Sequence, residues 1–200
     1  ELLLSSFKEY LRMSCYIIFP VMISMSVLAK PLILVILTDK WLPITDLFMF
    51  LCIGYMWIPL MVLNNQILHV KGRTDYFLKA EIIKKIVGLF ILVVTMPFGL
   101  TVLCIGLLVY NFFDMIIIIY FSKKVINTGY FEQFKSISTI LFLSIAMGVT
   151  IHLSLLLISN IYLQLFLGIL IGLVFYISFS YWFKIKEFNF LLRKFKKLII

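Results

Sequence analysis

Long, nearly uninterrupted runs of apolar residues constrain this chain more than any other feature of its sequence. Hydrophobic residues make up 64% of the 200 residues, and charged residues only 14%. A helix needs about 20 apolar residues in a row to cross the hydrocarbon core of a bilayer. The strands of a membrane barrel would instead alternate apolar and polar residues in segments of about 10. We therefore predict an all-α transmembrane protein.

Turn-forming and polar residues divide the apolar runs into six predicted spans. Gly72 separates two of them, and Pro97 to Gly99 forms another tight turn. A six-helix bundle is the simplest arrangement of these spans. Residues 1–12 are then an N-terminal segment and residues 184–200 a basic tail. The expected helices cover about 13–37, 44–70, 76–96, 100–121, 137–157 and 161–183.

The basic residues gather on one side of the predicted bundle. Of the 18 Lys and Arg residues, only Lys30 and Lys40 fall outside the basic side. The residues counted on the basic side include Lys79, Lys84 and Lys85. The positive-inside rule assigns this side to the cytoplasm, so both termini are predicted to be cytoplasmic. The net charge of +9 then reflects topology and attraction to anionic membrane lipids. No nucleic-acid partner is expected, because the cations lie between apolar runs.

The sequence carries no pattern that indicates an enzyme. Cys15, Cys52 and Cys104 lie far apart in apolar runs, and no HExxH, GxSxG, P-loop or GxGxxG motif is present. The longest internal connection, from Ser122 to Ser136, is too short to hold a catalytic domain. We therefore predict a protein that is not an enzyme and that binds neither a metal nor a cofactor.

Lys30 is the most informative ionisable residue within the predicted spans. It precedes Pro31, which removes a backbone donor and tends to kink a helix. A cation beside such a kink can face a central cavity and attract a phosphate. Alternatively, the lysine extends to the headgroups at the outer surface. Both interpretations stay open.

Asn64 and Asn65 belong to a polar stretch within the second predicted span. Consecutive residues in a helix are rotated by about 100°, so these side chains cannot all face one side. They either form hydrogen bonds with neighbouring helices or line a wet cavity. Both residues are candidates for binding a polar substrate.

Asn111 and Asp114 share one face of the fourth predicted span, because they lie three residues apart. Ionisable groups inside a membrane are costly and mark functional sites by default. Asp114 is expected to pair with a cation on a neighbouring helix, to sit near the cytoplasmic interface, or to carry a coupling proton. His152, in the fifth span, is the second candidate for ion coupling, although Ser144 and Gly148 on the same face also fit simple packing.

Several segments resemble the bacterial polysaccharide and lipopolysaccharide (O-antigen) flippases of the MOP exporter superfamily, which are called Wzx-like. The resemblance is clearest over residues 8–125. It is carried by the stretch from Ala29 to Trp41, by Asn64 to Val70 with the loop Lys71 to Asp75, by Glu81 to Ile86, and by Pro97 to Leu100.

The resemblance implies a transporter of about 12–14 helices in two lobes around a central cavity. These residues would form the C-terminal lobe. Their partner would be the missing N-terminal lobe of the same protein. The implied location is the bacterial inner membrane. The implied substrate is an undecaprenyl-pyrophosphate-linked oligosaccharide, moved across the membrane by alternating access. Within that scheme Lys30 is the leading phosphate-binding candidate and Arg73, at the cytoplasmic mouth, the second.

Three other functions would each show a different feature in the sequence. A MOP-type drug/cation antiporter would favour several acids inside the membrane, and Asp114 is the only acid well inside a predicted span. A membrane-bound enzyme would need larger loops. A non-transport membrane subunit of a glycan-assembly complex is compatible with everything in the sequence.

Overall fold

The computed structural model describes residues 2–199, and it describes side chains over residues 3–193. These residues form helices throughout, joined by short connections. The helices are α1 (Leu2–Val27), α2 (Ala29–Ile36), η1 (Asp39–Ile44), α3 (Thr45–Tyr55), α4 (Ile58–Val70), α5 (Thr74–Thr95), η2 (Met96–Phe98), α6 (Leu100–Ile126), α7 (Tyr130–Leu157), α8 (Ile161–Trp182) and α9 (Lys186–Ile199).

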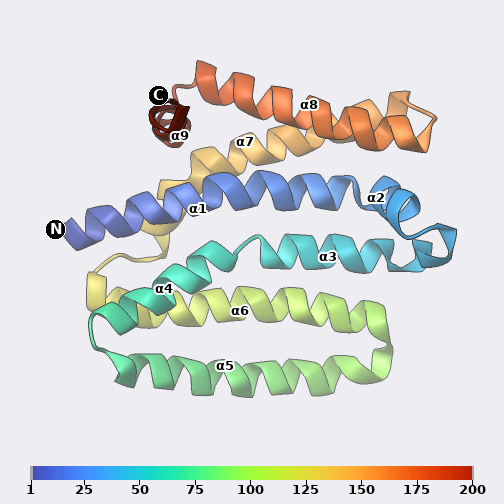
Figure 1. The fold of residues 1–200 in the computed structure, drawn as a ribbon. Helices are drawn as coiled ribbons and strands as arrows, with labels where there is room; N and C mark the ends of the chain where they lie inside the picture. Colours follow the sequence, from blue (N-terminus) through green and yellow to red (C-terminus); the bar gives the residue numbers. More distant parts are fainter. Residues whose placement is uncertain (1, 200) are drawn as a thin grey trace.

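The long helices lie side by side, with α8 along one edge of the bundle and α5 along the other (Figure 1). The N-terminus, the α4–α5 turn, the α6–α7 connection and α9 lie at one end. The elements η1 and η2 and the α7–α8 turn lie at the opposite end. The connections rich in lysine and arginine therefore share one end of the bundle, as the charge pattern predicts.

Within the described residues, five stretches are long and apolar enough to cross a membrane: Leu3–Val27, Asp39–Val70, Leu100–Ile126, Tyr130–Leu157 and Ile161–Trp182. The chain is a multi-pass α-helical membrane protein. Helix α5 is not among the five, although it lies along the length of α6 (Figure 1). Its composition sets it apart, because Lys79, Glu81, Lys84 and Lys85 interrupt its apolar sequence.

The first predicted span differs from the observed structure at both of its ends. Helix α1 starts at Leu2 rather than near residue 13, because Phe7, Leu11 and Cys15 form a buried stripe at a spacing of four residues. The predicted segment 1–12 is therefore part of the first helix. The helix then ends at Val27, since Pro31 has no N–H to donate to the Val27 carbonyl, and the chain continues as α2.

The second predicted span is also divided in two. Helix α3 ends at Tyr55 and α4 begins at Ile58, because Pro59 cannot donate a hydrogen bond to the Tyr55 carbonyl. Trp57 fills this break. Its ring packs against Phe19 of α1, Phe112 of α6 and Phe134 of α7, with centroids 5.6–5.8 Å apart.

Two predicted polar connections are mostly helical. The expected loop from Ser122 to Ser136 shrinks to residues 127–129, because α6 continues to Ile126 and α7 starts at Tyr130. Asn127 ends α6 in a left-handed conformation with φ 53°. Within the predicted basic tail 184–200, Lys186–Ile199 forms α9. Both segments are helical because apolar residues recur through them at helical spacing.

Two glycines of α8 allow it to pack closely against the rest of the bundle. A Cβ atom on Gly168 would lie 2.6 Å from Cδ2 of Leu28, and one on Gly172 would lie 2.9 Å from Cδ1 of Ile151. The GxxxG pattern in this helix therefore serves contacts within the chain.

Candidate functional site

A charged cluster lies between α5 and α6. The Nζ atom of Lys84 lies 2.5 Å from Oε1 of Glu81, one turn earlier on α5, and 2.9 Å from Oδ1 of Asp114 on α6. The Lys84 side chain is only 4% exposed, whereas those of Asp114 and Glu81 are 16% and 31% exposed. A buried ammonium of this kind is stable only because both carboxylates surround it.

This cluster lies about half-way along both helices. Lys84 follows the first residue of α5 by ten positions, or about 15 Å, and Asp114 precedes the last residue of α6 by about 18 Å at ~1.5 Å per residue. The sequence-based count assigned Lys84 to the basic side, whereas the structure places it half-way between the two ends of α5. Asp114 has the partner cation on a neighbouring helix that one of its interpretations expected.

A groove of about 340 Å³ lies between α5 and α6. Lys85 and Tyr110 line it together with apolar residues of both helices. Gly88 makes room for the tyrosine, since a Cβ atom there would lie 2.9 Å from Cε2 of Tyr110. Lys85 is exposed at nearly the same depth as Lys84. A lysine facing lipid at the centre of a bilayer costs about 2.5–3.5 kcal/mol, so this face of α5 is suited to protein or water.

A second polar cluster, which contains Asn64, joins α4, α6 and α7 in the buried interior. Asn64 and Gln133 exchange side-chain hydrogen bonds of 2.9 and 3.0 Å. Ser122 donates its hydroxyl to the Asn64 carbonyl oxygen, and Asn64 also donates to the backbone oxygen of Leu60 at 2.7 Å. All three side chains are at most 1% exposed. The geometry places Asn64 in an internal network, the hydrogen-bonding alternative expected from its sequence.

The other predicted substrate-binding residues are dispersed. Lys30 is exposed on α2, towards the end opposite the basic connections (Figure 1). Asn65 is half-buried, and its Oδ1 is buried without a hydrogen-bond partner in the described part of the chain. Arg73 is exposed in the α4–α5 turn, where it donates to both carboxylate oxygens of Asp75 and covers the ring of Tyr76 at 4.0 Å.

Asn111 and His152 do not join the charged cluster. Asn111 is buried where α6 meets α3, and a Cβ atom on Gly54 would lie 2.9 Å from its Nδ2. His152 is exposed on α7. Of the residues predicted for ion coupling, only Asp114 therefore contacts another ionisable group within the described side chains. Among the described side chains, no group of three His, Cys, Asp or Glu residues could hold a metal ion.

Sequence analysis missed Glu81, Lys84 and Lys85 as site residues. Their signal was present, because three charges fall within five positions of this helix. Lys84 and Lys85 were assigned as topology charges because they follow a basic loop. Gln133 was missed because it fell in a segment expected to be a loop.

With its fold described, the chain can be compared with known proteins. It is a multi-pass helical membrane protein with a buried charge cluster half-way along α5 and α6. The family model described as "Polysaccharide biosynthesis protein" matches residues 1–46, which cover α1, α2, η1 and the start of α3. No curated protein and no solved structure matches the chain. The comparison therefore relates the first helices to polysaccharide biosynthesis.

Proposed function

We propose that this chain is part of a transporter that flips lipid-linked oligosaccharides, the precursors of surface polysaccharide or lipopolysaccharide, across the bacterial inner membrane. The match of residues 1–46 to polysaccharide biosynthesis proteins carries the proposal. A multi-pass bundle without a large soluble domain in the described residues suits a transport step. The proposed substrate is an oligosaccharide on an undecaprenyl pyrophosphate carrier.

The α5–α6 face supports a transport role. Lys85 and the partly exposed Glu81 lie about half-way along a helix whose charges set it apart from the five apolar spans. Such a face requires a polar neighbour. In the proposed transporter that neighbour is a second helical lobe of the same protein, and the space between the lobes is the alternating-access cavity. Lys85 is then positioned to attract the pyrophosphate.

Reconstitution tests this proposal directly. The full-length protein in liposomes is expected to move a fluorescent undecaprenyl-pyrophosphate oligosaccharide between leaflets. Lys85→Gln should lower the rate about tenfold, whereas Lys79→Gln, on the same helix near the basic end, should change it less than twofold. Export of cationic drugs instead of the saccharide would identify a drug/cation antiporter. Transport of neither would identify a non-transport subunit of glycan assembly.

Lys30 provides a second variant for the same assay. It lies within the matched region and is exposed on α2. Lys30→Ala is expected to reduce surface glycan without loss of protein from the membrane, and Lys30→Arg is expected to be milder. Normal glycan with the alanine variant would remove Lys30 from the mechanism.

The proposed orientation, with the basic end in the cytoplasm, has its own test. All three native cysteines are buried, so membrane-impermeant thiol reagents report on introduced cysteines alone. Lys71→Cys, in the α4–α5 turn, should label only from the cytoplasm, and Asp39→Cys, at the start of η1, only from outside. Labelling of both from the same side would contradict the orientation.

A further inference from the structure

The last helix turns across the end of the bundle. Lys184 adopts a left-handed conformation with φ 49°, and the N–H of Ile185 donates to the Ser180 carbonyl at 3.0 Å, which closes α8. Helix α9 is seen end-on in Figure 1, whereas α8 runs across the view. The α9 sequence separates phenylalanine and leucine from lysine and arginine at helical spacing. Helices with this pattern lie in the plane of the membrane interface.

An ion pair fixes α9 to the bundle. Arg12 of α1 donates from Nε and Nη2 to the two carboxylate oxygens of Glu187, with 3.1 Å for the Nη2 bond. Its Nη1 donates to the backbone oxygen of Ser136 on α7 at 2.8 Å. The Arg12 guanidinium therefore links α1, α7 and α9, and these contacts hold the three helices around the space beside it.

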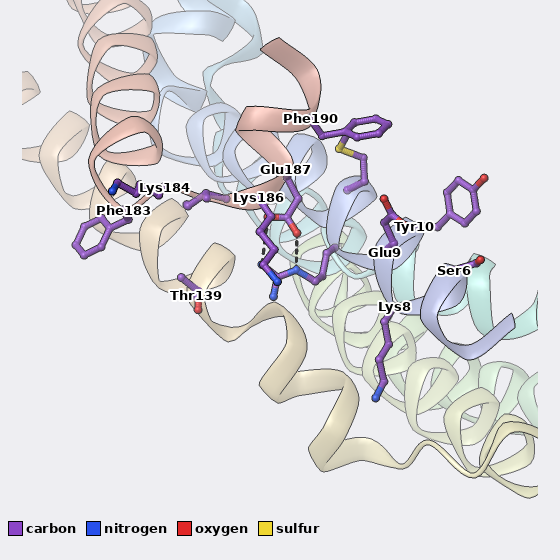
Figure 2. A pocket seen from close by; sticks show the side chains of 13 residues that line it. Ser6, Lys8, Glu9, Tyr10, Thr139, Phe183, Lys184, Lys186, Glu187 and Phe190 are labelled. Atoms are coloured by element: carbon purple, nitrogen blue, oxygen red, sulfur yellow. Dashed lines mark hydrogen bonds and ion pairs between the residues drawn. The ribbon is translucent and has the colours of Figure 1, made fainter. Parts of the chain in front are cut away.

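That space is a pocket of about 590 Å³ at the basic end of the bundle. Figure 2 shows its walls: Lys8 and Tyr10 come from α1, Thr139 from α7, and Lys184 and Lys186 from the α8–α9 corner. The volume lies within the range of about 300–1,000 Å³ that is usual for small-molecule sites.

The charges of the pocket favour an anion. Its lining contains Lys8, Arg12, Lys184 and Lys186 but only two acids, Glu9 and Glu187. Arg12 is occupied by Glu187, and Lys8 lies 3.8 Å from Glu132. Lys184 and Lys186 are both exposed, and neither lies within 4 Å of a carboxylate among the side chains that the structure describes.

Exposed aromatic rings beside the pocket favour a lipid over a soluble anion. Phe183 and Phe190 line the pocket and are 65% and 47% exposed, and the neighbouring Trp182 is 74% exposed. Aromatic side chains of this kind lie at the level of the headgroups and contact the upper acyl chains. Basic pockets between helix ends at this level bind anionic headgroups.

We propose that this pocket binds the phosphate headgroup of an anionic glycerophospholipid from the leaflet at the basic end. Lys184 and Lys186 contact the phosphate, Thr139 offers a hydroxyl group, and Phe183, which lies beside Lys184 in Figure 2, contacts the first part of an acyl chain. This site is separate from the α5–α6 face and does not depend on the transport function.

Lipid titration of the full-length protein in detergent, followed by native mass spectrometry, tests this site. Phosphatidylglycerol is expected to bind more tightly than phosphatidylcholine. Lys184→Gln/Lys186→Gln should weaken phosphatidylglycerol binding about tenfold and leave phosphatidylcholine unchanged. The arginine pair Lys184→Arg/Lys186→Arg should bind as the native protein does, because it keeps both charges.

Two controls separate the alternatives. Lys71→Gln/Lys79→Gln removes the same charge from the α4–α5 side and should change binding less than twofold, so an equal loss there would reduce the site to a general charge effect. Soluble glycerol 3-phosphate should not compete at matched concentration. Effective competition by it would make this a soluble-anion site and overturn the lipid assignment, as would equal binding of phosphatidylcholine.

Discussion

Helices α5 and α8 form opposite edges of the bundle and expose similar amounts of apolar surface. Leu89 and Phe90 of α5 are 66% and 68% exposed, and Phe166 and Leu173 of α8 are 65% and 58% exposed. Their charges differ completely. Helix α8 contains no Asp, Glu, Lys or Arg, whereas α5 has Lys84 and Lys85 half-way along its length.

This difference shows that exposed apolar area alone does not identify a lipid-facing surface. Lipid and a partner lobe both accept leucine and phenylalanine, but only a partner or water accepts a charge at mid-membrane depth. We therefore interpret the α8 edge as facing lipid and the α5 edge as facing the proposed second lobe. The following predictions test that interpretation, beginning with the largest expected effect.

Removing the Lys84 ammonium should be the most damaging change in α5. Lys84→Met leaves Glu81 and Asp114 without a counter-ion, and the loss of one partner of a buried pair costs about 3–5 kcal/mol. Denaturant unfolding in mixed micelles measures this free energy. The triple variant Glu81→Gln/Lys84→Met/Asp114→Leu should recover most of it. If the single variant unfolds like the native protein, the cluster does not stabilise the α5 edge.

Introducing a lysine at each edge compares the two surfaces directly. Leu173→Lys in α8 should cost about 2.5–3.5 kcal/mol if that residue faces lipid, and the amount of inserted protein should fall. Leu89→Lys in α5 lies beside the groove near Lys85 and should insert almost normally. Quantitative membrane fractionation of the two variants provides the measurement. Equal losses would mean that both edges face the same medium.

Replacing one glycine on each edge by alanine should reduce stability more at the tightly packed α8 edge than at the α5 edge. Gly168→Ala places a Cβ atom 2.6 Å from the Cδ2 atom of Leu28, which is only 2% exposed. The expected loss of stability is about 1–3 kcal/mol. Gly88→Ala meets the Tyr110 ring beside the groove, where the ring has room to move, so less than about 1 kcal/mol is expected. Thermal unfolding of both variants measures the difference, and a reversed order would contradict this account.

Acid should loosen the junction of α8 and α9, and this is the smallest of the expected effects. Burial alone raises the pKa of Glu187, but hydrogen bonds and attraction from Arg12 outweigh it, and the pKa falls below its ordinary value of 4.5. A carboxylate with a lowered pKa stabilises the fold above its unfolded pKa, and this stabilisation is lost as the pH falls through the folded value. The window therefore lies below about pH 4.5, and the effect is about 1 kcal/mol or less.

Fluorescence of a dye attached to a cysteine at Phe190 reports on α9 during an acid titration. The signal should change below about pH 4.5 in the native protein. Glu187→Gln should abolish this transition. A transition that persists in the glutamine variant would belong to another group.

Much of the fold follows from hydropathy and charge. The helical membrane bundle and the gathering of basic connections at one end follow from runs of apolar residues and from the positions of lysine and arginine. These features depend on average properties of long segments, which a sequence displays directly. The breaks at Leu28 and Trp57 depend on single prolines. Sequence analysis noted Pro31 as a kink without predicting two separate helices, and it did not predict the break before Pro59.

The site was harder to predict because pairing depends on depth and on neighbours. Lys84 follows a basic loop in the sequence, and only the position of α6 shows that Asp114 lies beside it. Asn64 is likewise satisfied by Gln133, 69 residues away, in a segment whose polarity suggested a loop. A polar residue that is paired across helices and one that faces solvent look the same in a single sequence.

The division between α3 and α4 has a mechanical consequence. Pro59 has no N–H, so the Tyr55 carbonyl has no bond along the helix for bending to break at that point. The crossing is expected to bend between its two helices, where Trp57 lies among three aromatic rings. Bending there changes the stacking of the indole, so the fluorescence of Trp57 would report on bending of this crossing once Trp41 and Trp182 are replaced by phenylalanine.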